Sequence, residues 1–315
     1  MSRSAWILVA IGVVGGSGIA FYTPATLDHV PVTVTDPDLS ALLREPLDQL
    51  IPGTEKRLTW FAEEQATDWS VVAMHGFSAS RQETAPLAEM VATELGANLF
   101  ETRFSGHGLK TDGLAGVMAE AWLNDVAEAL TVGRLIGKKT VLIAVSNGAA
   151  LALSMLDHPA MQTVDSLIML SPNFGPADPK AMWITGPGGP LLLRLISGER
   201  RSWDAYNELQ ERYWTTSYPT ETVIEVMRVV DRALKKIATA TAPRVQLIYS
   251  PNDQVISIAA LQSGYATINA PEKMIVEIPE TGSPSAHIIA GDIISPDNTD
   301  RIAAQITDFV LRRAP

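Results

Sequence analysis

The sequence contains no cysteine in its 315 residues, which excludes disulfides, a thiol nucleophile and a cysteine-linked lipid. It has five histidines, and none has the spacing to other ligands that is typical of a metal site, so we expect no metal or other cofactor. No glycine-rich phosphate loop follows an early strand, which argues against nucleotide chemistry. The formal net charge is −11, and a clustered basic surface for nucleic acid is missing.

What is present is enough apolar sequence for one sizeable core, since 46% of the residues are hydrophobic. Apolar runs typical of buried strands alternate with helical patterns, and this alternation predicts an α/β fold with a mostly parallel, doubly wound sheet. The expected strands cover about 57–62, 70–75, 97–102, 140–145, 166–171, 244–249 and 273–278. The expected helices cover about 82–95, 116–136, 147–157, 221–239, 257–268 and 297–312.

The N-terminal residues 5–22 are mostly apolar and carry no charge, and Arg3 precedes them. As a helix this segment would reach about 27 Å, which is marginal for crossing a bilayer. Two interpretations stay open: a membrane anchor, or a signal peptide cleaved near Gly18–Ala20. Either places the catalytic domain outside the cytoplasmic membrane, tethered to it or secreted, with residues 23–56 as a linker.

Ser146 stands between an apolar run, residues 141–145, and a run of small residues that opens a helix. This layout predicts a nucleophile elbow, a sharp strand-to-helix turn that lifts a serine hydroxyl above the sheet. Gly148 lets the helix approach the strand closely. Ala144 replaces the glycine usual on the other side, and we interpret it as a tolerated variant.

A second turn, His75-Gly76-Phe77, follows the strand expected at 70–75. The backbone N–H of Phe77 is expected to point into the same cavity as that of Asn147, the residue after the elbow serine. Two oriented amides of this kind form an oxyanion hole for acyl transfer. We interpret the His75 side chain itself as stabilising the turn.

The order of the remaining candidates along the chain completes a triad. Asp253 follows the strand at 244–249, and His287 follows the last strand and is the histidine that comes after Asp253. Nucleophile, acid, then histidine is the order that follows a nucleophile elbow in this kind of sheet. We therefore predict Ser146 as nucleophile, His287 as general base and Asp253 as the group that orients it.

With these motifs the chain resembles the α/β-hydrolase family, and within it the serine esterases and monoacylglycerol-lipase-like members. The resemblance covers about residues 57–315 and rests on residues 75–77, on Arg103–Gly108 with its Arg-x-x-Gly-His-Gly pattern, and on the three triad positions. It implies a parallel-rich sheet wrapped by helices, a cap over the site, and hydrolysis of an ester-like bond through an acyl-enzyme. We interpret Arg103 and His107 as structural.

The long interval between the strands at 166–171 and 244–249 is expected to hold that cap, at about residues 173–242. Its aromatic and leucine side chains line an acyl pocket in one interpretation, with Trp183, Leu192 and Trp214 as candidates. In the other they form the small core of the cap itself.

Three functions are therefore weighed. The leading one is hydrolysis of carboxylic esters, such as acylglycerols or other lipid esters. The second is an aminopeptidase, whose cap would need carboxylates for a substrate ammonium group, with Asp204, Glu208 and Glu211 as candidates. The third is a non-catalytic protein that binds a ligand or partner, which the intact triad disfavours. The sequence does not indicate an oligomeric state.

Overall fold

Seven strands form the main sheet of the computed structural model, which describes residues 26–31, 38–178 and 189–312. Their order across the sheet is β1 (Arg57–Thr59), β3 (Asn98–Glu101), β2 (Thr67–Met74), β4 (Gly137–Val145), β5 (Val164–Leu170), β8 (Arg244–Tyr249) and β9 (Lys273–Glu277). Strand β1 is antiparallel to β3, and every other neighbouring pair is parallel. The α/β class with a mostly parallel sheet is confirmed.

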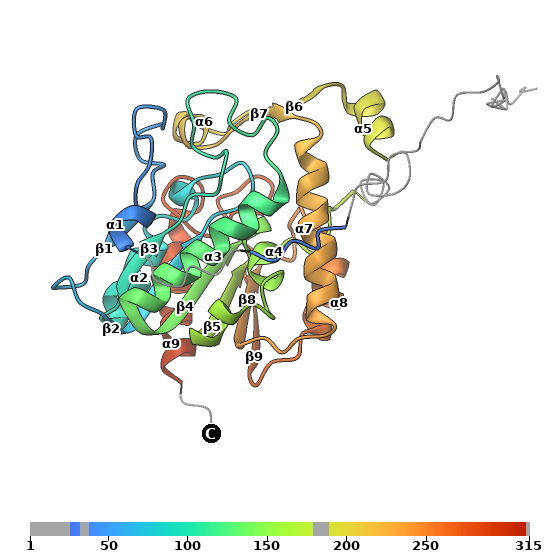
Figure 1. Cartoon of the computed structure of the whole chain (residues 1–315). Coiled ribbons are helices and arrows are strands. Elements are labelled where there is room, and N and C mark those ends of the chain that lie inside the picture. Colours follow the sequence, from blue (N-terminus) through green and yellow to red (C-terminus); the bar gives the residue numbers. More distant parts are fainter. Residues whose placement is uncertain (1–25, 32–37, 179–188, 313–315) are drawn as a thin grey trace, which may run out of the picture.

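Helices cover both faces of the sheet (Figure 1). One face carries α3 (Ala119–Ile136), α4 (Asn147–Leu153), α7 (Thr222–Ile237) and α8 (Ile258–Thr267), and the other carries α2 (Leu87–Leu95) and α9 (Pro296–Leu311). A short helix, α1 (Leu39–Leu42), precedes β1. Strand β4 serves both layers because successive side chains of a strand point to opposite faces: Leu142 packs toward α3 and α4, and Ile143 toward α2 and α9.

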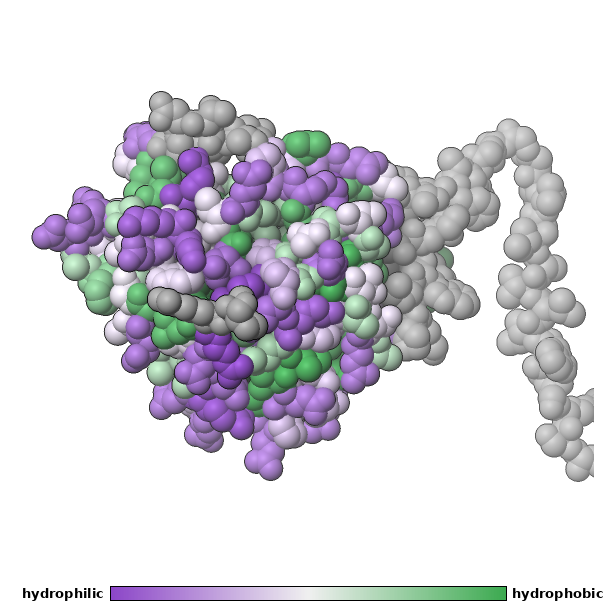
Figure 2. Space-filling model, turned by 90° about the horizontal axis from the view of Figure 1, so that it is seen from below, coloured by the Kyte–Doolittle hydropathy of each residue, from purple (hydrophilic) through white to green (hydrophobic). Residues whose placement is uncertain are grey.

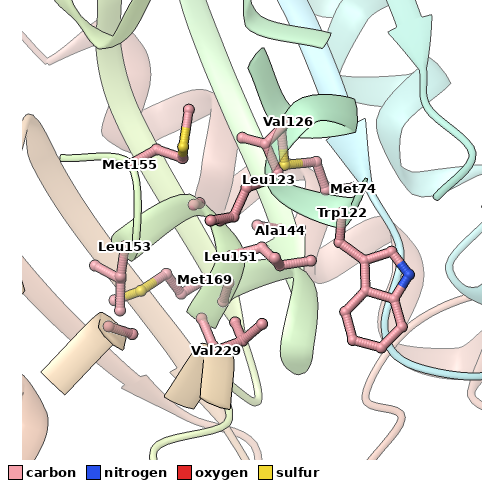
Figure 3. Close-up of a cluster of buried hydrophobic side chains, with 14 of the residues drawn as sticks. Met74, Trp122, Leu123, Val126, Ala144, Leu151, Leu153, Met155, Met169 and Val229 are labelled. Carbon is pink, nitrogen blue, oxygen red and sulfur yellow. The ribbon is translucent and has the colours of Figure 1, made fainter. Parts of the chain in front are cut away.

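The core beneath α4 sets how close the elbow helix lies to the sheet (Figure 3). Ala144 of β4 is fully buried there, with Leu151 of α4 and Leu123 of α3 in the same apolar cluster. Met74 of β2 and Val229 of α7 belong to the same cluster. These side chains hold α4 against the strand that carries its first turn.

The helix expected at 82–95 is two elements in the structure. A single 3-10 turn, η1 (Arg81–Glu83), comes first, and α2 begins only at Leu87. Pro86 explains the break, because proline has no N–H to donate and disfavours helical backbone at the residue before it. The prediction of one continuous helix was wrong at this point.

The segment above the carboxyl ends of the strands contains α5 (Gly189–Ser197), the hairpin β6 (Arg200–Ser202) with β7 (Ser217–Pro219), and α6 (Glu208–Tyr213). These elements lie at the top of Figure 1. Helix α7 falls inside the range 173–242 that we expected for the cap, yet it packs against α4 in the helical layer. The part over the site therefore ends before α7.

The opposite face of the molecule is seen in Figure 2. Hydrophilic residues occupy most of it, with hydrophobic patches between them. This face lies at the end of the molecule away from the cap, so the functional groups described below are on its far side.

The expected membrane anchor or signal peptide at residues 1–22 lies outside the described residues. Among the helices that the structure describes, none combines the length and the apolar character needed to span a bilayer. The prediction for the N-terminal segment stays a prediction.

Candidate active site

Ser146 occupies the sharp turn between β4 and α4, with a φ of 49° and a ψ of −114°. A positive φ is unusual for a residue with a side chain, and such strain concentrates at functional sites. Gly148 is required two residues later, because a Cβ there would lie 2.5 Å from the carbonyl oxygen of His75 and 3.0 Å from that of Met74. The structure therefore has the local geometry of a nucleophile elbow.

Three side chains from separate loops meet at this turn. The Ser146 Oγ lies 3.0 Å from Nε2 of His287, and Nδ1 of the same imidazole lies 2.7 Å from Oδ2 of Asp253. The other carboxylate oxygen of Asp253 accepts the N–H groups of Val255 at 2.8 Å and Ile256 at 3.2 Å. The carboxylate is thus fixed at one oxygen and presents the other to the imidazole, which places the proton on Nδ1 and leaves Nε2 to face the hydroxyl.

The two backbone amides expected beside Ser146 are available. Within the described residues, neither the N–H of Phe77 nor that of Asn147 has an acceptor. Both neighbours of Phe77 are engaged: Gly76 donates to Oε2 of Glu83 at 2.6 Å, and Ser78 donates to Nε2 of His107 at 3.0 Å. The amides on both sides of Phe77 are therefore held by hydrogen bonds, and the N–H of Phe77 between them is available to a ligand.

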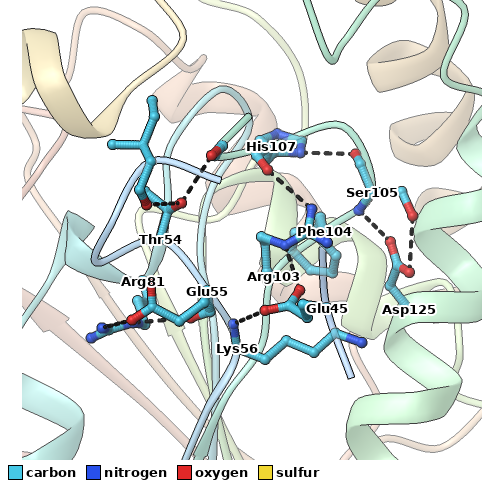
Figure 4. Close-up of polar contacts among 12 residues, drawn as sticks. Glu45, Thr54, Glu55, Lys56, Arg81, Arg103, Phe104, Ser105, His107 and Asp125 are labelled. Carbon is cyan, nitrogen blue, oxygen red and sulfur yellow. Dashed lines mark hydrogen bonds and ion pairs between the residues drawn. The ribbon is translucent and has the colours of Figure 1, made fainter. Parts of the chain in front are cut away.

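The loop that contains Arg103 and His107 contacts this turn through the hydrogen bond from Ser78 to His107. Figure 4 shows the polar contacts that hold the loop itself. Arg103 pairs with Glu45 at 2.6 Å and donates to the carbonyl of His107 at 3.1 Å. Asp125 of α3 accepts the backbone N–H of Ser105 at 2.6 Å and its hydroxyl at 3.0 Å. These contacts agree with our interpretation of Arg103 and His107 as structural.

His75 and His107 each donate from Nδ1 to a nearby carbonyl and accept a backbone N–H at Nε2, so both rings are neutral. Their surroundings keep them so: burial lowers the pKa of His75 well below its usual range and lowers the pKa of His107 to about 4. Burial also raises the pKa of Asp125 to about 6, against the two hydrogen bonds from Ser105.

A cavity of about 450 Å³ opens above Ser146 and His287. Its wall is largely aromatic and aliphatic, with Phe77, Trp203, Tyr206, Trp214, Tyr218, Val223, Val226, Met227, Ile256 and Ile288. Of the three pocket residues expected in the cap, Trp214 lines this cavity. Trp183 and the side chain of Leu192 lie outside what the structure describes.

The cap is joined directly to the turn that carries Phe77. The backbone N–H of Thr215 donates to the carbonyl of Ser78 at 2.7 Å. The rings of Tyr218 and Phe77 pack edge to face, with their centroids 4.9 Å apart. The cavity roof and one expected oxyanion donor are therefore parts of one connected structure.

Charged groups are few at this cavity. Asp204 lines it together with Arg201, whereas Glu208 and Glu211 of α6 are not among the described lining residues. Burial raises the pKa of Tyr218, and the positive charge of Arg201 acts in the opposite direction. Of the three carboxylates considered for recognition of an amine, the structure thus brings one to the cavity.

Glu83 is the cavity residue that the sequence did not reveal. Only 3% of it is exposed, and it lines the cavity beside Ser146. Burial raises its pKa to about 7, although the Gly76 hydrogen bond and the charge of His287 act in the opposite direction. A glutamate in an expected helix is ordinarily solvent-exposed, so no pattern in the sequence marked it.

Comparison with known proteins gives one family match: the model described as serine aminopeptidase, S33, matches residues 65–282. A comparison with curated protein sequences gives no match. Among solved structures, that of the metagenome-derived lipolytic enzymes LipS and LipT is similar, with a TM-score of 0.67, 17% identity and coverage of 83% of this chain and 99% of that one.

Two monoacylglycerol lipases are similar as well. The enzyme of Paleococcus ferrophilus has a TM-score of 0.60 at 14% identity, covering 81% of this chain and 97% of its own. Monoglyceride lipase of Saccharomyces cerevisiae has a TM-score of 0.60 at 11% identity, covering 81% of this chain and 91% of its own. At these identities the similarity establishes the shared α/β-hydrolase fold.

Proposed function

We propose that this chain, which belongs to the serine aminopeptidase family S33, is a serine hydrolase that cleaves carboxylic esters. One observation carries the proposal: the hydrogen-bonded series Ser146–His287–Asp253 opens onto an apolar cavity. Such a series makes an alcohol nucleophilic, and the cavity suits an acyl chain.

In the first half of the proposed reaction, Ser146 attacks the ester carbonyl while Nε2 of His287 accepts its proton. Asp253 stabilises the imidazolium that forms and keeps the ring in the productive orientation. The negative charge that develops on the carbonyl oxygen is received by the amides of Phe77 and Asn147. Because these donors are fixed by the backbone, they need no reorganisation as the charge appears.

In the second half, the imidazolium returns its proton to the alkoxide that leaves, and an acyl group remains on Ser146. A water molecule then takes the place of the alcohol. The oxygen of that water bonds to the acyl carbon while His287 accepts its proton. The bond from the acyl carbon to Ser146 Oγ then breaks, the imidazolium returns the proton to Oγ, and the free acid departs. All steps use the same three side chains and the same two amides.

The substrate class that we propose is an ester with an apolar acyl group, such as an acylglycerol or another lipid ester. The cavity wall supports this, because aromatic and aliphatic side chains from the cap and from α7 form most of it. A volume of about 450 Å³ falls within the range of sites for small molecules.

A panel of nitrophenyl esters with acyl chains of increasing length tests the proposal, with Ser146→Ala as the control. We expect turnover that rises with acyl length up to the capacity of the cavity, and loss to background in the variant. Ester turnover that persists in Ser146→Ala would exclude Ser146 as nucleophile. Absence of labelling by a fluorophosphonate would instead favour a binding protein.

An aminopeptidase is the second candidate, and the carboxyl groups at the cavity favour it. Asp204 and Glu83 both line the cavity, where a substrate ammonium group would need a negative partner. Aminoacyl amides run beside the esters separate the two functions. A higher kcat/KM for the amides, reduced by Asp204→Asn, would replace the esterase assignment.

We further propose that the enzyme acts outside the cytoplasmic membrane, tethered or secreted through residues 1–22. The support is the uncharged apolar run after Arg3. Cell fractionation of the full-length chain tests this. Recovery of the uncleaved protein in the soluble cytoplasmic fraction would exclude both alternatives.

A further inference from the structure

Glu83 is a buried carboxyl group in the candidate site that the triad does not use. Its Oε2 accepts the N–H of Gly76 at 2.6 Å, one residue before the amide of Phe77. The carbonyl of Gly76, which belongs to the same planar peptide as the N–H of Phe77, accepts a hydrogen bond from Nδ1 of His75 at 2.8 Å. Glu83 and His75 therefore fix the two peptides on either side of Gly76. The carboxyl group thus acts on the turn that presents the oxyanion donor.

The glycine between them shows how close the carboxyl group is to the nucleophile. A Cβ on Gly76 would lie 3.0 Å and 3.2 Å from the two carboxylate oxygens of Glu83, and 3.3 Å from Cβ of Ser146. Glu83 and Ser146 therefore flank the same face of Gly76. Only a residue without a side chain leaves the carboxyl group and the elbow this close together.

The segment that carries Glu83 is held at both ends. In η1, Arg81 donates to the carbonyl of Glu55 at 3.0 Å and to its carboxylate at 2.9 Å, and Gln82 donates to the carbonyl of Gly53 at 3.0 Å. On the other side, the carbonyl of Ala85 accepts the N–H of Asp292 at 2.9 Å.

Asp292 lies in the loop that carries His287, so this segment links the oxyanion turn to the histidine loop. Gly291 confirms the close packing, because a Cβ there would lie 2.7 Å from the carbonyl oxygen of Glu83. A side chain held on such a support keeps its position when the reaction changes the charges around it.

Those charges include the one on His287, which lines the same cavity. Arg201 and Asp204 line this cavity as well, and the positive form of His287 attracts the Glu83 carboxylate. The burial that raises the pKa of Glu83 to about 7 makes this group change its charge near neutral pH.

We propose that Glu83 is a positioning residue of the hydrolytic reaction: together with His75 it fixes the turn that presents the Phe77 amide, so that this oxyanion donor is in place when Ser146 attacks. The inference rests on the proposed function only in so far as Ser146 is the nucleophile. It holds for esters and amides alike, because both reactions form an imidazolium and an oxyanion.

Two substitutions test this role. Glu83→Gln keeps an oxygen that can accept the N–H of Gly76, and Glu83→Ala removes it. Glu94→Gln is the matched control, since Glu94 is exposed on the neighbouring helix α2. The readout is the second-order rate of Ser146 labelling by a fluorophosphonate from pH 5 to 9, which needs no knowledge of the natural substrate.

For Glu83→Gln we expect labelling near the wild-type rate, because the amide oxygen still accepts the N–H of Gly76. For Glu83→Ala we expect labelling to fall about 10-fold at every pH, less than the roughly 10²–10³-fold loss when an oxyanion donor is removed outright. On the best ester, kcat of Glu83→Ala should fall by a similar factor with KM nearly unchanged. A purely structural role would lower the stability of the folded variant without this fall in kcat and its rescue by glutamine.

The proposal is overturned if folded Glu83→Ala labels at the wild-type rate, or if Glu83→Gln loses as much labelling as Glu83→Ala while Glu94→Gln loses none. If Glu83→Ala does not fold, Glu83→Met takes its place, because methionine fills a similar volume without an oxygen acceptor. Failure of the proposed function is distinct, since wild-type protein would then be labelled without turning over the esters, or would not be labelled.

Discussion

Replacing Asp253 by Asn tests the proposed mechanism most sharply, because the structure dictates which way the new amide must face. The amide oxygen must accept the N–H groups of Val255 and Ile256, since the reverse orientation sacrifices two buried hydrogen bonds, each worth about 1–3 kcal/mol when left unmade. The amide NH₂ then faces Nδ1 of His287, which must become an acceptor. The ring proton moves to Nε2, 3.0 Å from Ser146 Oγ, where no base remains.

The wrong tautomer should lower kcat by about 10⁴-fold, equivalent to about 5.5 kcal/mol of transition-state stabilisation. KM should change little, because Asp253 makes no contact in the cavity wall. Steady-state ester kinetics measure both quantities, and Asp292→Asn, an exposed change in the histidine loop, is the control. A kcat within 10-fold of wild type, in a folded variant with an unchanged melting temperature, would refute this role for Asp253.

Three further changes have expected outcomes. Gly148→Ala should push α4 away from the carbonyl of His75, costing about 1–3 kcal/mol in urea unfolding and slowing labelling of the elbow serine. Trp214→Leu should enlarge the cavity and raise the ratio of kcat/KM for longer over shorter acyl chains. For Asp125→Asn, the folded carboxyl keeps its proton to about pH 6 and the unfolded one only to about 3.8, so wild-type stability relative to the variant should fall from pH 4 to 6 in thermal unfolding.

The central strands β2, β4 and β5 could be predicted to within a few residues because each contains a continuous apolar run, as burial on both faces of a parallel sheet demands. The candidate triad was found for the same reason. Its three residues follow strands whose carboxyl ends must lie at one edge of the sheet, so their order along the chain implied their proximity. The structure brings Ser146, Asp253 and His287 together, and their catalytic roles await the experiments above.

The cap was harder to predict because its elements carry no pattern of their own. Strand β6 (Arg200–Ser202) is exposed at every residue. It pairs with β7, and α6 lies between the two strands in the sequence. Such a strand has no alternation of apolar and polar residues to read. Helix α7 was recognised as a helix, but nothing in its periodicity shows that it packs on α4 while residues near its start line the cavity.

Glu83 was missed for a different reason. Its importance comes from one contact, with the N–H of Gly76, seven residues earlier along the chain. That contact exists because Pro86 ends the short turn η1 before α2 begins, which leaves Glu83 directed inward. Sequence periodicity reports the average face of a helix, and a single inward residue in the preceding turn leaves no trace in it.

The hydrogen bond from Thr215 to Ser78, with the edge-to-face contact of Tyr218 and Phe77, connects the cap to the backbone that carries the Phe77 amide. A change in the position of this part of the cap would therefore also move the backbone next to that amide. The cap thus contributes to the geometry that receives the oxyanion, in addition to forming the cavity wall.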